Sequence, residues 1–123
     1  MDTATWCTRI ASVILGAFGV LHGTRLGNIE QMMQAGGVKA PLDALLKASW
    51  LIFSLEMVMV AIVAIVASQI ERGGRIVLLC AAMMAANAVL VFHFVGLFIG
   101  VYAVSLVTIL YAAGGWLQCR KAA

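Results

Sequence analysis

Apolar residues fill four long stretches of this sequence, and polar residues gather in the short segments between them. The stretch at residues 45–68 is the most informative, because it carries one acid, Glu56, followed by eleven uninterrupted apolar residues at 57–67. A helix of that length reaches about 36 Å at about 1.5 Å per residue, enough to cross a hydrocarbon core of about 30 Å. The pattern therefore predicts a membrane span that carries a buried acid.

The same pattern predicts four spans, at about residues 10–26, 44–68, 75–95 and 97–117, with a polar loop at 27–41. The connections are short, so we expect one transmembrane domain over residues 1–123, all-α and folded as an up-down-up-down four-helix bundle. The small residues Ser12, Gly16, Gly19 and Gly23 form a stripe along the first span. Such a stripe lets another helix approach closely.

Composition agrees with this class: 64% of the residues are apolar and 11% are charged, whereas about 25% are charged in soluble domains. The eight Lys and Arg residues are scattered singly, which gives no basic patch for a nucleic acid. Five of them fall on the side that would hold both termini and three on the other, which favours cytoplasmic termini. We expect a multi-pass protein of the bacterial inner membrane, in contact with the lipid bilayer.

Polar side chains within the spans are predicted to lie at two depths. His22, Lys47, Trp50 and His93 fall within about 10 Å of the outer span ends, whereas Asn87 falls at roughly 12 Å and Glu56 at roughly 18 Å. Tyr102 is predicted to lie at the shallower of the two depths. Together these side chains predict a polar funnel that opens outward.

The third span sets the direction in which its histidine is expected to point. Ala82, Ala86, Val89 and His93 recur along one face of that span, and we interpret this face as the packing face. His22 lies beside the small-residue stripe of the first span, so both imidazoles are expected to point toward neighbouring helices.

These placements suggest roles. Glu56, His22 and His93 are the candidate catalytic residues, because a carboxylate and imidazoles in a low dielectric can act as acid and base. Candidate ligand contacts are Trp50, Asn87, Tyr102 and Lys47. Simpler readings stay open: Lys47, Trp50, Tyr102 and Tyr111 as interfacial anchors, and Glu56 as a structural partner of Asn87 or a histidine. Glu56 lies about 12 Å too deep to share a metal with the histidines, so no metal site is expected.

The layout resembles the DoxX-like family of small four-span bacterial membrane proteins. The matching pieces are the glycines at 16–23, Pro41, Glu56 in SLEM, and the run from Arg75 to His93 through AAMMAANAVLVFH. His22 and Trp50 have no counterpart in that motif. The resemblance implies a membrane subunit or small enzyme linked to quinone or other lipophilic redox chemistry.

The sequence leaves several functions open. The first is binding of a lipophilic small molecule such as a quinone, isoprenoid or sterol-like compound, with isomerase or oxidoreductase chemistry at Glu56. The second is a haem b held between His22 and His93 for electron transfer. The third is proton-coupled transport by a homodimer with Glu56 as the carrier, and the fourth is an accessory or assembly role beside a partner membrane subunit. Whether the protein is an enzyme is left undecided.

Overall fold

The computed structural model describes residues 2–121, and all of its regular structure is helical. The helices are α1 (Thr3–Thr24), α2 (Leu26–Ala35), α3 (Leu42–Ala67), α4 (Gly74–Val95) and α5 (Ile99–Lys121). Four of them, α1, α3, α4 and α5, are long and apolar enough to cross a membrane. The predicted all-α class with four candidate spans is confirmed. The up-down-up-down order of crossing stays a prediction.

Two elements differ from their predicted bounds. Helix α1 begins at Thr3 rather than near residue 10, because the Asp2 side chain accepts a hydrogen bond from the Thr5 backbone N–H at 2.9 Å and caps the helix. Within the predicted loop at 27–41 the sequence allowed one or two helical turns at 29–33, and the structure has the longer helix α2 there, of which only Met33 is buried. Helix α2 ends where Gly37 adopts a positive φ of 69°, a conformation that glycine adopts readily.

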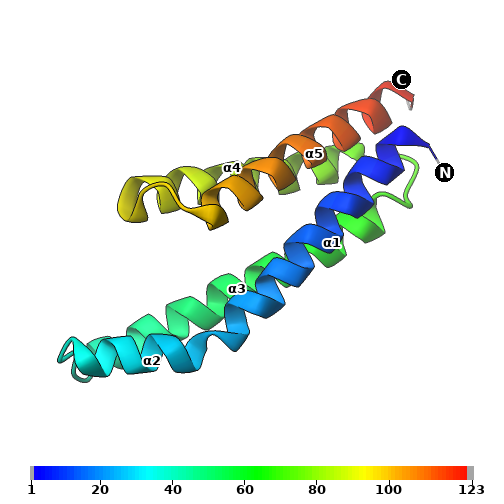
Figure 1. The fold of residues 1–123 in the computed structure, drawn as a ribbon. Helices are drawn as coiled ribbons and strands as arrows, with labels where there is room; N and C mark the ends of the chain where they lie inside the picture. Colours follow the sequence, from blue (N-terminus) through cyan, green and yellow to red (C-terminus); the bar gives the residue numbers. More distant parts are fainter. Residues whose placement is uncertain (1, 122–123) are drawn as a thin grey trace.

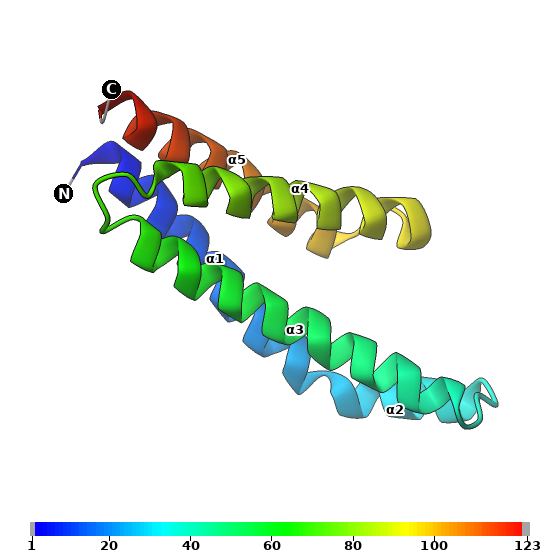
Figure 2. The same cartoon turned by 180° about the vertical axis from the view of Figure 1, so that it is seen from behind.

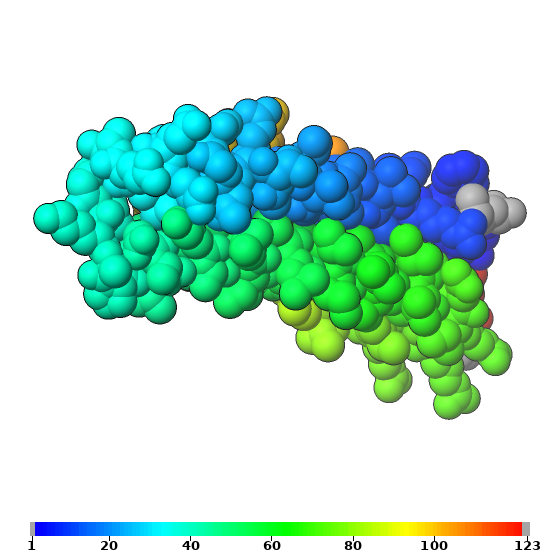
Figure 3. Space-filling model, turned by 90° about the horizontal axis from the view of Figure 1, so that it is seen from below, coloured from blue at the N-terminus to red at the C-terminus, as the bar shows by residue number. Residues whose placement is uncertain are grey.

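The helices pack as two pairs that form a wedge (Figures 1 and 2). Helix α1 runs beside α3, and α4 runs beside α5. The pairs meet at the end that holds both termini and the α3–α4 turn, and they diverge toward the end that holds α2 and the α4–α5 turn. Seen from below, α1, α2 and α3 form one continuous face (Figure 3). We name the two ends of the wedge the closed end and the open end.

Glycines make the closed end. A Cβ atom on Gly114 would lie 2.4 Å from Thr8 Oγ1 of α1, and one on Gly115 would lie 2.9 Å from the Gly74 carbonyl oxygen of α4. Helix α5 can therefore approach both neighbours only because it carries no side chain at these positions.

A buried hydrogen bond joins α1 to α5 near these glycines. Tyr111 is fully buried, and its hydroxyl lies 3.0 Å from Ser12 Oγ. Ser12 already donates its hydroxyl proton to the Thr8 carbonyl oxygen, so Tyr111 is the donor. The prediction that Tyr111 is an interfacial anchor is therefore wrong, and the side chain is part of the core.

The predicted packing stripe on α1 is confirmed, whereas the predicted packing face of α4 is not. A Cβ atom on Gly19 would lie 2.9 Å from the Ser54 carbonyl oxygen of α3, which shows how closely the two backbones approach. The face of α4 that was predicted to pack is exposed instead, and it comprises Ala82, Ala86, Val89 and His93. Lipid tails and neighbouring helices are both apolar surroundings, so small apolar residues do not distinguish the two faces.

Candidate functional site

A cavity of about 350 Å³ lies between the two helix pairs toward the open end. All four long helices line it, and its apolar walls include Phe18, Phe53, Ala88, Val91, Val101 and Val104. The volume falls within the range of about 300 to 1,000 Å³ that is typical of small-molecule sites. Only three lining side chains carry polar atoms, namely His22, Ser49 and Trp50. We call this space the wedge cavity.

His22 and Trp50 form one wall of the wedge cavity as a stacked pair. Their ring centroids are 3.7 Å apart with 16° between the planes, and the ring of Phe53 meets the imidazole edge-on at 5.3 Å. The Trp50 indole N–H donates to the His22 carbonyl oxygen at 2.8 Å. The sequence predicted that these two residues share a layer, and the structure brings them into contact.

Ser54 holds the imidazole of His22 in place, although it was not predicted as a site residue. Its Oγ lies 2.8 Å from His22 Nδ1. Ser54 follows Trp50 by four positions, so both residues lie on the face of α3 that packs against α1. The four-residue spacing could have identified Ser54 from the sequence, because residues four positions apart lie on the same face of a helix.

Lys47 and Tyr102 lie outside the wedge cavity lining. The Lys47 ammonium is 3.1 Å from a Glu30 carboxylate oxygen and joins α3 to α2. Tyr102 is 59% exposed on α5. Both placements agree with the simpler reading of these residues as structural or interfacial groups.

Glu56 lies in a different place, in a small apolar groove between α3 and α4 that also includes Met59 and Cys80. The Asn87 side-chain N–H donates to Glu56 Oε1 at 2.9 Å. The structural pairing with Asn87, which the sequence left open, is therefore present. The predicted depths of the two residues were close enough for this contact.

His93 is exposed near the end of α4, and its ring meets Phe94 edge-on at 4.8 Å. It does not line the wedge cavity. The structure therefore places His22, Glu56 and His93 in three different surroundings rather than in the common funnel that was predicted. Within residues 2–121, no cluster of three or more His, Cys, Asp or Glu side chains could hold a metal ion.

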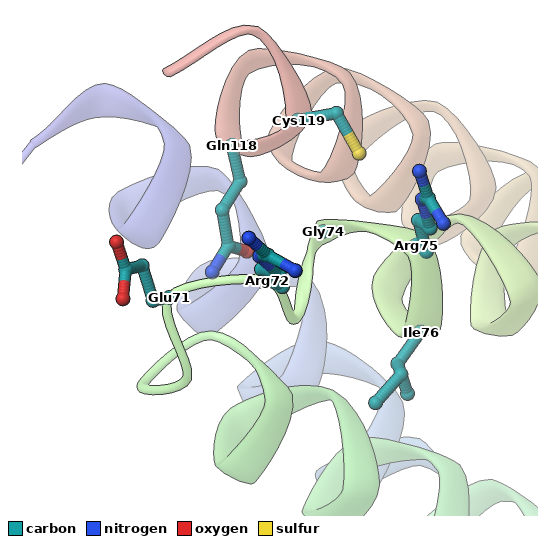
Figure 4. Close-up of a pocket in the computed structure, with 7 residues that line it drawn as sticks. All are labelled: Glu71, Arg72, Gly74, Arg75, Ile76, Gln118 and Cys119. Atoms are coloured by element: carbon teal, nitrogen blue, oxygen red, sulfur yellow. The ribbon is translucent and has the colours of Figure 1, made fainter. Parts of the chain in front are cut away.

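A second hollow, of about 620 Å³, lies at the closed end between the α3–α4 turn and α5 (Figure 4). Gln118 points toward the turn and donates to the Ile70 carbonyl oxygen at 2.9 Å. Arg72 and Arg75 also line the hollow, and Arg72 lies close to Gln118 in this view. Basic residues at span ends are the usual markers of membrane orientation, which explains these arginines without a ligand.

Comparisons with protein-family models, with curated proteins and with solved structures give no match. The resemblance to the DoxX-like family therefore stays a prediction, and function is argued below from the wedge cavity alone.

Proposed function

We propose that this protein binds a lipophilic small molecule in the wedge cavity, with the hydrocarbon part between the helix pairs and the polar end at His22. The observation that carries the proposal is the contrast between the apolar cavity walls and the one oriented imidazole beside them. Ligand sites of this size are usually apolar, with a few fixed polar groups that orient the ligand.

The ligand classes named from the sequence, a quinone, an isoprenoid or a sterol-like compound, all combine a hydrocarbon body with a small polar head. The Phe18 and Phe53 rings and the valines of α4 and α5 would contact the body. The stacked His22 and Trp50 pair would contact the head. The stacked and hydrogen-bonded pair is held in place before a ligand binds, so it loses little conformational entropy on binding.

Glu56 has no part in this proposal, because its carboxylate faces the α3–α4 groove and is bonded to Asn87. The haem b and proton-coupled transport alternatives stay predictions, as does catalysis. A haem would need His93 to turn toward His22, and transport would need Glu56 to give up its bond to Asn87. Neither movement is supported by the contacts described above.

Ligand-dependent thermal stabilisation tests the proposal. The purified protein in lipid nanodiscs would be heated with farnesol and, separately, with decylubiquinone, a hydroxyl and a carbonyl head group on hydrocarbon chains. A ligand at 100 times its Kd stabilises the folded state by about 2.7 kcal/mol. We expect at least one of the two compounds to raise the unfolding temperature.

Two phenylalanine variants on α4 make the test specific. Ala88 lines the wedge cavity, so Ala88→Phe should fill it and remove the ligand-dependent shift. Ala86 lies on the exposed face of the same helix, so Ala86→Phe should keep the shift. The proposal fails if neither compound stabilises the protein, or if both variants respond as the unsubstituted protein does.

A further inference from the structure

The hydrogen bonds around His22 determine which of its ring nitrogens carries the proton. Ser54 Oγ lies 2.9 Å from the Trp50 carbonyl oxygen and 2.8 Å from His22 Nδ1. A carbonyl oxygen can only accept, and we assign the single serine proton to the hydrogen bond with Trp50. The contact with the imidazole is then a hydrogen bond only if Nδ1–H donates to Ser54 Oγ.

The neutral imidazole therefore has an unprotonated Nε2. No group within residues 2–121 donates a hydrogen bond to Nε2. In this part of the chain, every fully buried side-chain nitrogen or oxygen of the half-buried residues has a partner, so the unpartnered Nε2 must be accessible. His22 lines the wedge cavity, so Nε2 is a hydrogen-bond acceptor that a bound molecule can reach.

The other polar side chains of the cavity supply no donor. The Trp50 indole N–H is engaged with the His22 carbonyl oxygen, and the Ser49 hydroxyl donates to the Leu45 carbonyl oxygen at 2.9 Å. Every side-chain donor that lines the wedge cavity is thus already used within the protein, while His22 Nε2 and Ser49 Oγ can still accept.

We infer that the wedge cavity selects lipophiles whose polar end is a hydrogen-bond donor, namely hydroxyl compounds such as an isoprenoid alcohol, a sterol or the reduced, quinol form of a quinone. This inference rests on the proposed function. The ligand hydroxyl donates to His22 Nε2. A carbonyl or ether oxygen has no proton to donate, so it would place one hydrogen-bond acceptor beside another, the Nε2 atom. An unmatched pair of acceptors in an apolar cavity costs binding free energy.

The test compares farnesol with farnesyl methyl ether, which has the same hydrocarbon body and no donor, by thermal shift titration at neutral pH. A neutral hydrogen bond is worth about 0.5–1.5 kcal/mol, so the ether should bind roughly threefold to tenfold more weakly. In Ser54→Ala the imidazole loses the partner that holds its proton on Nδ1, so the preference for the alcohol should fall. Ser49→Ala removes a hydroxyl from the same cavity without touching His22, and it should keep the preference.

A measurement without ligand checks which ring nitrogen of His22 carries the proton. The chain has two histidines, so ¹⁵N NMR of the imidazoles can be assigned with a His93→Gln variant. The spectrum should show neutral His22 with its proton on Nδ1, and Ser54→Ala should change that signal. A proton on Nε2 overturns the inference.

The outcomes separate the inference from the proposed function. Equal binding of alcohol and ether, both abolished by Ala88→Phe, would keep the binding function and overturn the requirement for a donor. In that case the backbone N–H of Gly100, at the start of α5 and in the cavity lining, would be the donor, since the Val101 N–H already donates to the Phe98 carbonyl oxygen. Failure of both compounds to bind would overturn the proposed function and the inference together.

Discussion

The closed end and the open end of the wedge are built from the same four long helices, yet the helix pairs are in close contact at one end and leave an apolar cavity between them at the other. At the closed end, glycines and a serine face the seams, and Tyr111 fills the space between α1 and α5. At the open end, Phe18, Phe53 and Phe98 line the space between the helix pairs. The size of the side chains at each level therefore decides where helices meet and where a ligand fits.

The comparison also separates polar groups that hold the fold from those that are available to a ligand. The Tyr111–Ser12 and Asn87–Glu56 bonds each join two helices. His22 is held on one side by Ser54 and lines the wedge cavity, where the proposed ligand would contact its other ring nitrogen. A polar residue within a span thus becomes a site only when the packing leaves one of its atoms accessible.

The strongest test of the closed end is Gly114→Val. The new Cβ atom would overlap Thr8, so α5 must move away from α1, and we expect a loss of about 1–3 kcal/mol in the free energy of unfolding. Ala113→Val is the matched control, because Ala113 is exposed on the same helix. Thermal unfolding in detergent measures both. Equal stability of the two variants would mean that the closed end is not packed as described.

Tyr111→Phe tests the same seam more gently. It removes the hydroxyl that donates to Ser12, while Ser12 keeps its bond to the Thr8 carbonyl oxygen, so we expect a loss of about 0.5–1.5 kcal/mol. Tyr102→Phe removes a hydroxyl from the exposed tyrosine and should leave the unfolding temperature unchanged. If Tyr102→Phe cost as much as Tyr111→Phe, the buried bond would contribute nothing.

Substitutions of Glu56 test whether it belongs to the fold or to the site. Glu56→Gln keeps an oxygen that can accept from Asn87 and should change stability little, whereas Glu56→Leu leaves Asn87 without its partner and should cost about 1 kcal/mol. Farnesol binding should be unchanged in Glu56→Gln. Loss of binding in that variant would move Glu56 into the site and revive its predicted chemical role.

The smallest expected effect concerns the two chain ends at the closed end. The Lys121 ammonium lies 2.6 Å from Asp2 Oδ2, and this hydrogen bond holds the pKa of the exposed Asp2 carboxyl well below its usual range. The carboxylate therefore stabilises the fold above the ordinary aspartate pKa, and the contribution is lost as the pH falls below about 4.

Asp2→Asn keeps the helix cap and removes the charge, so it isolates the ion pair. Its unfolding temperature should be slightly below that of the unsubstituted protein at pH 6, and the difference should shrink toward pH 3. A difference that grew as the pH fell would contradict the pairing.

The sequence determined the all-α class and the four long apolar helices, because hydropathy and a fixed rise per residue depend only on the chain itself. From the rise per residue, the sequence also predicted that His22 and Trp50 share a layer, and it left open a pairing of Glu56 with Asn87. It could not determine which way each span faces. In a membrane both the lipid and the neighbouring helix are apolar, so the face that ends in His93 was expected to pack and is exposed.

The divergence of the two helix pairs, and hence the position of the cavity, could be seen only once the helices were packed together. That outcome depends on side chains far apart in the sequence, such as Gly114 against Thr8 and His22 against Ser54. Close packing is a property of surfaces that meet, and no single helix contains that information.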